Sequence, residues 1–174
     1  DSKSISKNYL NKLTSLNYLG ARLMIFSSTQ DISPYYWHNI NDIKLPFLVF
    51  IHHTKLIDKK YYRGRYIYYL ATYLPHDDKL FNCNDETLEK LWLESLKKIF
   101  PNFDKKDIKE KHFFKYANAQ HIVDTSYANK IPDYKTPLKN VYLSNFSQIY
   151  PEDRGTNFAV REGEKIATLI SKVS

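Results

Sequence analysis

The sequence has 174 residues, of which 43 % are hydrophobic, so it is long enough to bury a core as one domain, or as one domain with part of another. Its formal net charge of +7 permits an acidic partner such as nucleic acid, phosphate groups or a membrane surface. Lysines and acids are interleaved, however, which favours a solvated lysine-rich surface over a dedicated basic patch.

A single cysteine, Cys83, excludes a disulfide framework or a cysteine zinc cluster within the chain, so the expected location is cytoplasmic. The six histidines lack the spacing of a zinc site, and no metal ligands are predicted. The longest apolar runs are far shorter than a bilayer span, so no membrane span is predicted. The sequence begins at Asp1, without Met, and enters helix-like sequence directly, from which we expect a segment of a longer protein.

The first half of the chain predicts one helix followed by three strands. A helix is expected over 5–13 with Ser4 as its cap, because four apolar residues share one face: Ile5, Tyr9, Leu10 and Leu13. Apolar runs at 19–26, 47–54 and 65–74 predict the strands. A connection with a cluster of aromatic residues separates the first two strands, and the basic turn KLIDKKYYRG separates the last two.

The second half is dominated by two predicted helices. The clearer one covers 85–100, with Asn84 as its cap, acids in its first turn and lysines in its last. Strands are expected at 111–116 and, after a long loop, at 141–145. The final helix, 156–172, carries small and apolar residues along one side: Ala159, Gly163, Ile166, Ala167 and Ile170.

This order of elements predicts an α+β fold with a mostly antiparallel or mixed sheet and flanking helices. It ends in a strand–turn–helix unit of the kind found in nucleotide-binding α/β layers. In the turn, Gly155 leaves room for a ligand beside backbone N–H groups, whose partial positive charge suits phosphate or the edge of a flavin. Simple capping of the helix by Asp153, Thr156 and Asn157 explains the same spacing, and no GxGxxG or Walker pattern occurs.

The ending NVYLSNFSQIYPEDRGTNFAVREGEKIATLI, at 140–170, resembles the C-terminal signature of the flavin-dependent amine oxidoreductases, specifically their protoporphyrinogen-oxidase-like and UDP-galactopyranose-mutase-like branch. The resemblance extends upstream through YLGARLMIF, SPYYWHNI, PFLVFIHHT, the capped helix and YANAQHI, so it covers most of the chain. The last motif is the most specific. YANAQHI departs from the family pattern, which commonly has proline where this sequence has His121.

The resemblance implies a full protein that carries FAD on an N-terminal Rossmann domain, in a missing half of the same chain. Residues 1–139 would form a substrate-binding domain, and 140–174 the strand and helix that complete the FAD site. The fragment alone would be inactive and without FAD, and no catalytic side chain is assigned to it. By position, the resemblance places six residues against the cofactor: Asn145, Asp153, Arg154, Gly155, Thr156 and Asn157.

Three residues are expected to face a small-molecule substrate. Trp37 and the two tyrosines before it are candidates for an aromatic wall, although core packing or a lid contact is the favoured explanation. Strand alternation places His52 and His53 on opposite faces, so the pair does not form one metal site, and the resemblance favours His53 toward the cavity. Tyr116, at the start of YANAQHI, is the third.

An alternative is a stand-alone binding module, in which a basic, tyrosine-rich sheet stacks nucleic acid bases or carbohydrate. Its best support is KKYYRGRYIYY at 59–69. Against it, the aromatic residues recur at strand spacing, as a core requires, so nucleic acid is not the expected partner. A structural or oligomerisation domain is a third option. The substrate, the reaction direction and the electron acceptor do not follow from the sequence.

Overall fold

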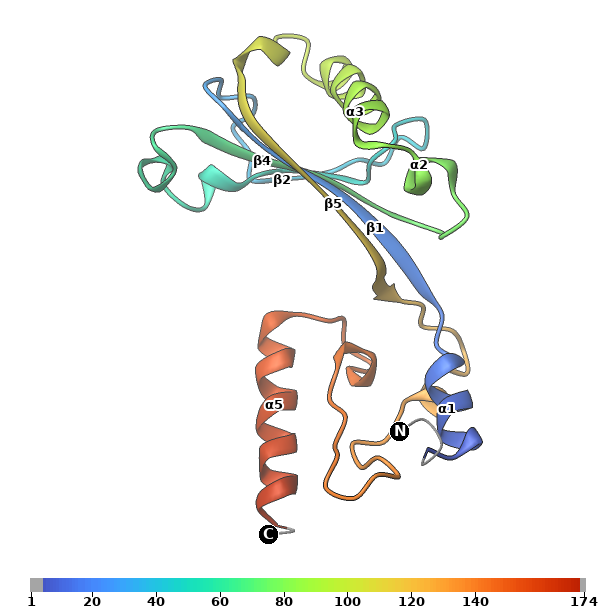
Figure 1. Cartoon of the computed structure of the whole chain (residues 1–174). Helices are drawn as coiled ribbons and strands as arrows, with labels where there is room; N and C mark the ends of the chain where they lie inside the picture. Colours follow the sequence, from blue (N-terminus) through green and yellow to red (C-terminus); the bar gives the residue numbers. More distant parts are fainter. Residues whose placement is uncertain (1–4, 173–174) are drawn as a thin grey trace. The chain divides into compact units, whose positions relative to one another are not determined.

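The structure is a computed structural model, in which residues 5–172 are described (Figure 1). The chain forms two compact units: unit 1 comprises residues 1–17 together with 121–174, and unit 2 comprises Tyr18–Gln120. The division predicted after residue 139 follows the proposed roles of the two segments, whereas these units are defined by contacts. The division by role therefore stays a prediction.

Unit 2 is built on a five-stranded antiparallel sheet with the strand order β2-β3-β4-β1-β5. At one end of the β1–β5 pair, the Thr29 backbone N–H donates to the Asp107 carbonyl (3.1 Å). The long strands β1 and β4 pair over nine residues and form the centre of the sheet. The five strands are β1 (Tyr18–Ser28), β2 (Trp37–Asn39), β3 (Val49–His52), β4 (Tyr66–Leu74) and β5 (Ile108–His121).

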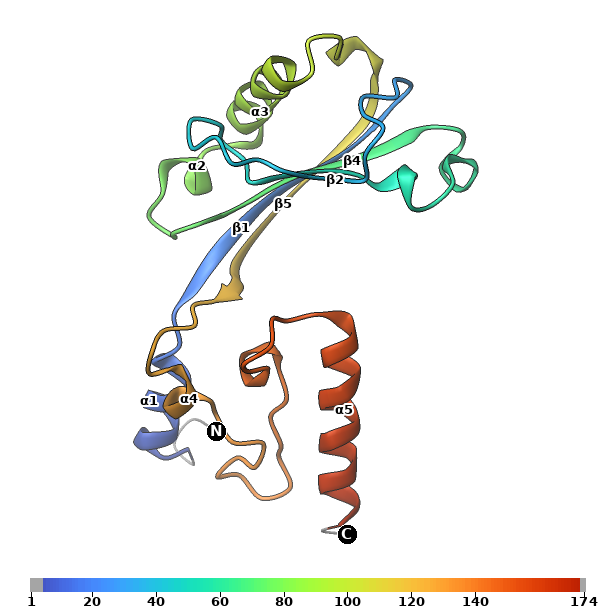
Figure 2. The ribbon, with the colours of Figure 1, turned by 180° about the vertical axis from the view of Figure 1, so that it is seen from behind.

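Helix α3 (Asp85–Ile99) covers one face of this sheet, and the short helix α2 (Lys79–Asn82) lies on the same side (Figures 1 and 2). The Asn84 side chain accepts a hydrogen bond from the Thr87 backbone N–H (2.9 Å) and caps α3. The apolar side of the helix and the facing strands form one buried cluster: Met24, Phe26, Phe47, Phe50, Tyr68, Leu70, Leu88, Trp92, Leu93, Leu96 and Phe103.

A close approach between strand and helix requires a glycine in β1. A Cβ atom at Gly20 would lie 2.3 Å from the ring of Phe81 in α2. The ring therefore packs directly on the strand backbone, and any side chain at position 20 would force the two elements apart. This contact belongs to the helix-bearing face and leaves the opposite face of the sheet unaffected.

Unit 1 is held together largely by hydrogen bonds between separate stretches of the chain. The Ile122 N–H donates to the Asn17 carbonyl (2.8 Å), which joins the two sequence segments of the unit. The buried Tyr127 hydroxyl donates to the Ser147 carbonyl (2.7 Å). The helical elements of the unit are α1 (Lys7–Thr14), α4 (Tyr127–Lys130), the 3₁₀ turn η5 (Phe146–Gln148) and α5 (Thr156–Ser171).

The structure confirms the α+β class, the mostly antiparallel sheet, the capped helix and the final helix. Three details differ. The predicted cap Ser4 lies outside the described residues, and Ser6 caps α1 by accepting from the Tyr9 N–H (3.3 Å). β5 is longer than the predicted 111–116 strand. β2 lies within what was predicted to be an irregular connection.

The short strand predicted at 141–145 is wrong in its extent. This segment forms a single isolated bridge, between Tyr142 and Lys135, and no ladder. The reason is local, because Asn140 adopts a left-handed conformation (φ 60°) just before the segment and Asn145 begins a capped 3₁₀ turn just after it. Too few residues remain between these two points to extend the pairing.

Candidate functional site

The sheet of unit 2 has a second face that neither α2 nor α3 covers (Figures 1 and 2). A row of directly paired residues crosses this face, because Trp37 pairs with Ile51, Ile51 with Tyr69 and Tyr69 with Ile25. Directly paired residues on neighbouring strands point to the same side of a sheet. Trp37 is half-exposed there, with 51 % of its surface accessible, so it is not part of the apolar core.

Tyr116 lies on this same face. On β5, Phe113 packs against the core and Lys115 lies over the ring of Phe81, so the odd-numbered residues face the helices. Alternation then directs Phe114 and Tyr116 to the opposite face, where their rings stack nearly parallel with centroids 6.5 Å apart. Both rings are exposed.

His53 is the first residue after β3 and lies at the edge of this uncovered face. β3 ends at the fully buried His52, and His53 begins the 3₁₀ turn η2 (His53–Lys55). Its Nε2 lies 2.7 Å from the Tyr62 hydroxyl, and its ring contacts Tyr69 with centroids 5.6 Å apart. The structure thus places all three predicted substrate residues, Trp37, His53 and Tyr116, on or beside one face.

Tyr69, Tyr62 and Phe114 belong to this face but were not singled out from the sequence. For Tyr69 a signal was present, because alternation along RYIYYLATYL separates its face from that of the buried Tyr68. Burial, and then the neighbouring hydroxyls of Tyr62 and Tyr36, raise the pKa of Tyr69. The phenol is therefore neutral at physiological pH, and it offers a hydroxyl group beside flat apolar surface.

The start of α5 offers free backbone N–H groups. Gly155 precedes the helix in an extended conformation (φ −169°), and its carbonyl accepts from the Ala159 N–H (3.0 Å). Over the described part of the chain, no side chain accepts a hydrogen bond from the amides of Thr156, Asn157 or Phe158. Asp153 is engaged elsewhere, because its Oδ1 accepts from the Arg154 N–H (2.8 Å). Simple capping by these polar side chains is thus not what the turn shows.

The backbone of Gly155 is not strained, but the first side chains of α5 lie close to it. A Cβ at this position would lie 2.7 Å from Asn157 Oδ1, so an alanine would require that side chain to move. Arg154 is half-buried and lies close enough to the buried His121 to contribute, after burial itself, to lowering the pKa of that imidazole. The turn therefore brings together a cation, a glycine and three amides.

Asn145 has a structural role at a different point of unit 1. Its side chain accepts from the Ser147 N–H (2.9 Å), and the Gln148 side chain accepts from the Asn145 N–H (2.8 Å), which makes a capping box for η5. Asn145 also lines a groove of about 320 Å³ beside α5, together with Phe146, Ile149 and others. No hydrogen bond links it to the turn at 153–157 among the described residues.

Glu162 was missed by the sequence analysis. It is the buried residue of α5, with 2 % of its surface accessible, and it lines the same groove as Asn145. Its carboxylate accepts from Tyr134, Arg161 (3.1 Å) and Lys165 (2.6 Å). Burial alone would raise the pKa of Glu162, but the hydrogen bonds from these donors outweigh it and lower that pKa. For Tyr134, burial and the hydrogen bond to Glu162 raise the pKa of the phenol to about 12. The cluster fixes α5 against the preceding loop.

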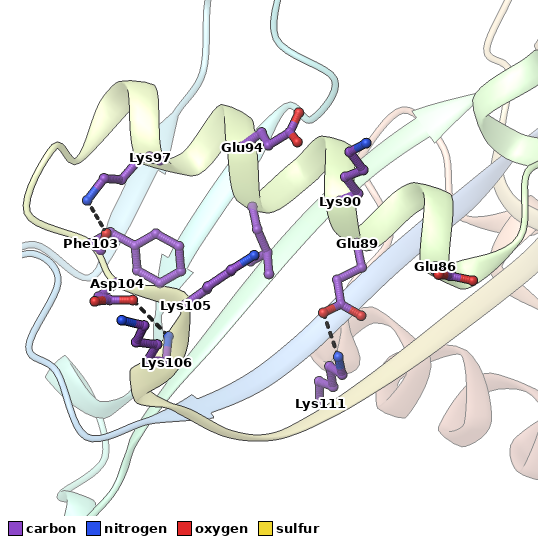
Figure 3. Close-up of a pocket in the computed structure, with 11 residues that line it drawn as sticks. Glu86, Glu89, Lys90, Glu94, Lys97, Phe103, Asp104, Lys105, Lys106 and Lys111 are labelled. Carbon is purple, nitrogen blue, oxygen red and sulfur yellow. Dashed lines mark hydrogen bonds and ion pairs between the residues drawn. The ribbon is translucent and has the colours of Figure 1, made fainter.

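A larger groove, of about 730 Å³, lies on the helix-bearing side of unit 2 between α3 and the segment around η4 (Lys105–Asp107) (Figure 3). Both acidic and basic side chains line it, and Glu89 pairs with Lys111. Lys97 donates to the Phe103 carbonyl (2.6 Å). None of the predicted site residues lines it. Because its charges largely offset one another, this groove selects no ligand class.

The described residues contain neither a candidate metal site nor a candidate membrane span. Within 5–172, no group of three or more histidine, cysteine, aspartate or glutamate side chains is placed to hold a metal ion. In the same range, every helix is too short or too polar to cross a lipid bilayer.

Comparisons with known proteins give likenesses of structure rather than of sequence. No protein-family description and no curated protein matches the sequence. Among solved structures, a candidate protoporphyrinogen oxidase from Exiguobacterium sp. 255-15 is similar with a TM-score of 0.70 and 13 % identity, over 94 % of this chain and 37 % of that one. An oxidoreductase from Methanosarcina mazei has a TM-score of 0.58 and 14 % identity, over 81 % and 33 % of the two chains.

A third similar structure is that of a reduced UDP-galactopyranose mutase, with a TM-score of 0.55 and 12 % identity over 69 % of this chain and 26 % of that one. The chain therefore spans between about a quarter and about two fifths of the length of each of these proteins. At such low identity the likeness is one of fold. The chain has the fold of one part of these larger oxidoreductase and mutase structures, which agrees with the family resemblance of its sequence motifs.

Proposed function

We propose that this chain is the substrate-binding and cofactor-closing portion of an FAD-dependent oxidoreductase of the amine oxidase type. The observation that carries the proposal is the fold likeness, which takes in 94 % of this chain but only 37 % of a candidate protoporphyrinogen oxidase. The motif QIYPEDRGTNFAVR, at 148–161, supports the same class independently. The rest of the cofactor site would be supplied by a Rossmann half in the same full-length protein.

In this proposal the start of α5 faces the flavin. FAD supplies the redox chemistry, which places negative charge on the pyrimidine side of the ring when it is reduced. The amides of Thr156, Asn157 and Phe158 have no side-chain acceptor within the described residues, and the helix dipole adds positive potential at the same point. Arg154 would add a full positive charge beside them. These residues fit an electron-rich ring edge.

In this proposal Asn145 supports the cofactor site indirectly, unlike the five residues of the turn. Its side chain is already engaged in the capping box of η5, so its contribution would be to hold the loop that precedes the turn. Direct contact with the cofactor would fall to Asp153, Arg154, Gly155, Thr156 and Asn157.

The uncovered face of unit 2 would bind the substrate. Trp37 and Tyr116 present flat, exposed rings, and His53 and Tyr62 present a hydrogen-bonded polar pair at the margin. Such a surface suits an organic molecule with an extended apolar body and a polar end.

The exposed side of helix α5 supports the proposal that another part of the protein packs there. Its predicted small-residue side is exposed at Ala159, Gly163 and Ala167, and a Cβ at Gly163 would meet nothing within 4 Å. Among the described residues, nothing therefore packs closely against the helix at Gly163. A Rossmann half that packs against this side would cover the surface and complete the cofactor site.

The test is a pair of substitutions in the full-length protein. Thr156→Asp places a carboxylate at the first position of α5, where it stabilises the helix but repels an electron-rich ring. We expect about tenfold weaker FAD binding and a lower flavin midpoint potential, with no loss of thermal stability. Thr168→Asp adds the same charge about 18 Å further along the same helix and should leave both flavin properties unchanged.

Equal effects of the two substitutions on the flavin, or no effect of either, would contradict the placement of the cofactor at this turn. The 174-residue chain gives a second test, because alone it should purify without the yellow absorbance of bound flavin. A stoichiometric flavoprotein obtained from the chain alone would contradict the proposal that another half holds most of the cofactor.

A further inference from the structure

Within the connection between β3 and β4, residues 55–65 carry side chains that, Tyr62 apart, neither the core nor the uncovered face of the sheet explains. This segment projects from the end of the sheet (Figures 1 and 2). It has one acidic residue, Asp58, against five basic ones: Lys55, Lys59, Lys60, Arg63 and Arg65. We refer to residues 55–65 as the basic loop.

The basic loop is a folded structure with its own hydrogen bonds. Asp58 caps the 3₁₀ turn η3 (Lys59–Tyr62) by accepting from the Lys60 N–H (2.8 Å). The Gly64 N–H then donates to the Lys59 carbonyl (3.0 Å). Arg63 and Gly64 both have positive φ, 55° and 75°, which turns the chain back toward β4. The side chains of the loop are therefore displayed from a preformed scaffold.

Three large apolar side chains of the loop point into solvent. Leu56 is 64 % exposed, Ile57 39 % and Tyr61 71 %. They lie within six residues of each other in a single tight loop, and none belongs to the buried cluster of unit 2. Adjacent exposed aliphatic and aromatic side chains of this kind mark an interaction surface.

The basic side chains around them differ in how far they are already paired. Lys55 pairs with Asp31 (2.8 Å) and Arg65 with Glu110 (2.7 Å), so these two anchor the base of the loop. Lys60 lies 3.8 Å from Asp58, at the outer limit of an ion pair, and over the Tyr61 ring. Within residues 5–172, no carboxylate pairs with Arg63. Lys59 is held at the base of β4, where its Nζ donates to the Tyr66 hydroxyl (3.0 Å). Lys60 and Arg63 are thus the charges most available to a partner.

We propose that the basic loop docks on an anionic lipid surface, with Leu56, Ile57 and Tyr61 entering the headgroup region and Lys60 and Arg63 meeting lipid phosphates. Apolar side chains surrounded by basic ones bind such an interface by combining burial with attraction to the negative surface. The charge of the loop and its exposed aliphatic residues are both accounted for by this partner.

Nucleic acid fits the same charge less well. Binding of single strands relies on several exposed rings on which successive bases stack. In the motif KKYYRGRYIYY, Tyr68 is fully buried, and the Tyr62 hydroxyl is hydrogen-bonded to His53. The ring of Tyr66 contacts Lys59 and His52. Tyr61 alone remains well exposed on the loop, beside two aliphatic residues that a nucleic acid would not cover.

The experiment is co-sedimentation of the 174-residue chain with vesicles of phosphatidylcholine, with and without phosphatidylglycerol. We expect binding to the anionic vesicles only, weakening as salt is raised. Lys60→Gln combined with Arg63→Gly should weaken it by about fivefold for each charge removed. Arg63→Gly relieves a positive φ, so this variant keeps its fold. Leu56→Ser combined with Tyr61→Ser should also weaken binding while the charge is unchanged.

The matched control is Lys105→Gln with Lys106→Gln, which removes two exposed charges from η4 elsewhere on unit 2. This variant should bind the vesicles as the parent chain does. An equal loss in the control would show diffuse attraction by net charge and overturn the proposal, as would equal binding to neutral vesicles. Loop-dependent binding of a single-stranded oligonucleotide, without binding to vesicles, would overturn it in favour of nucleic acid.

Discussion

The two units of this chain are held together in different ways. Unit 2 has an apolar core in which the ring of Trp92 is fully buried between α3 and the sheet. In unit 1, the large hydrophobic residues buried within the described range are Leu16, Tyr127 and Ile149. Much of what is buried there is polar, including Gln148 and Glu162.

This difference indicates which unit depends less on contacts from outside it. Burial of many large apolar side chains stabilises a fold without help from outside, whereas a unit held by hydrogen bonds gains less from each contact. Helix α5, with Glu162 as its buried residue, exposes most of its length. Unit 1 is therefore the part of the chain that the proposed Rossmann half would complete, whereas unit 2 draws more of its stability from its own core.

The largest expected effect tests the core of unit 2. Trp92→Ala removes a side chain with no accessible surface and its hydrogen bond to the Pro46 carbonyl (3.1 Å). The free energy of unfolding should fall by about 3–5 kcal/mol. Chemical denaturation, followed by circular dichroism, measures it. Leu91→Ala, one residue away and 40 % exposed, is the control and should cost less than about 1 kcal/mol. Similar losses from both changes would mean that α3 is not packed as described.

A smaller effect is expected from the polar contacts of unit 1. The buried Gln148 side chain donates to the carbonyls of Pro132 and Leu143 (both 3.1 Å) and accepts from the Asn145 N–H (2.8 Å). Gln148→Met keeps the length of the side chain but leaves these groups without partners, at a cost of about 2 kcal/mol. Hydrogen exchange of the unit 1 amides would report the loss of protection.

The same substitution in unit 2 provides the comparison. The Gln30 side chain likewise bonds to the backbone: it donates to the Asn102 carbonyl (2.7 Å) and accepts from the Asp104 N–H (3.1 Å). These contacts are exposed to water. Gln30→Met should therefore cost less than about 1 kcal/mol, because water replaces the lost partners. If Gln148→Met were equally mild, unit 1 would not depend on its polar contacts.

The same contrast explains how far the sequence could predict the structure. Periodicity predicted the elements of unit 2 because a strand or helix that packs on a core must repeat its apolar residues, as Leu88, Trp92 and Leu96 do. In unit 1 the order comes from side-chain hydrogen bonds between residues far apart in sequence, such as Tyr134 and Glu162. These contacts leave no period, so the loop before α5 and the burial of Glu162 were not predicted.

For the candidate site, the motif located the turn at 153–157, and alternation along β4 separated the two faces of the sheet. Alternation could not show which face α3 would cover, since both carry tyrosines. The placement of Trp37 required knowledge that it pairs with Ile51 across a short strand inside an apparently irregular connection. Non-local pairing of this kind is specified by the tertiary fold rather than by any local pattern.

The smallest expected effect is a dependence of stability on pH that arises within unit 2. His52 has no accessible surface; its Nδ1 lies 2.8 Å from the Ser33 carbonyl, and no hydrogen-bond partner reaches its Nε2 within the described residues. Burial, against an opposing contribution from the bond to Ser33, lowers the pKa of His52 below the value of 6.5 expected in the unfolded chain. The unfolded state therefore binds the proton more readily, and the stabilising contribution is complete only above that pH.

As the pH falls through about 6.5, the free energy of unfolding should decrease, with a slope of at most about 1.4 kcal/mol per pH unit for this one proton. Denaturation at several pH values between neutral and mildly acidic measures it. His52→Gln keeps a donor for Ser33 and removes the titration, so its slope should be smaller than that of the parent chain. His121 in unit 1 also has a lowered pKa, so part of the slope should survive in that variant. A slope unchanged by His52→Gln would show that His52 does not contribute to the dependence.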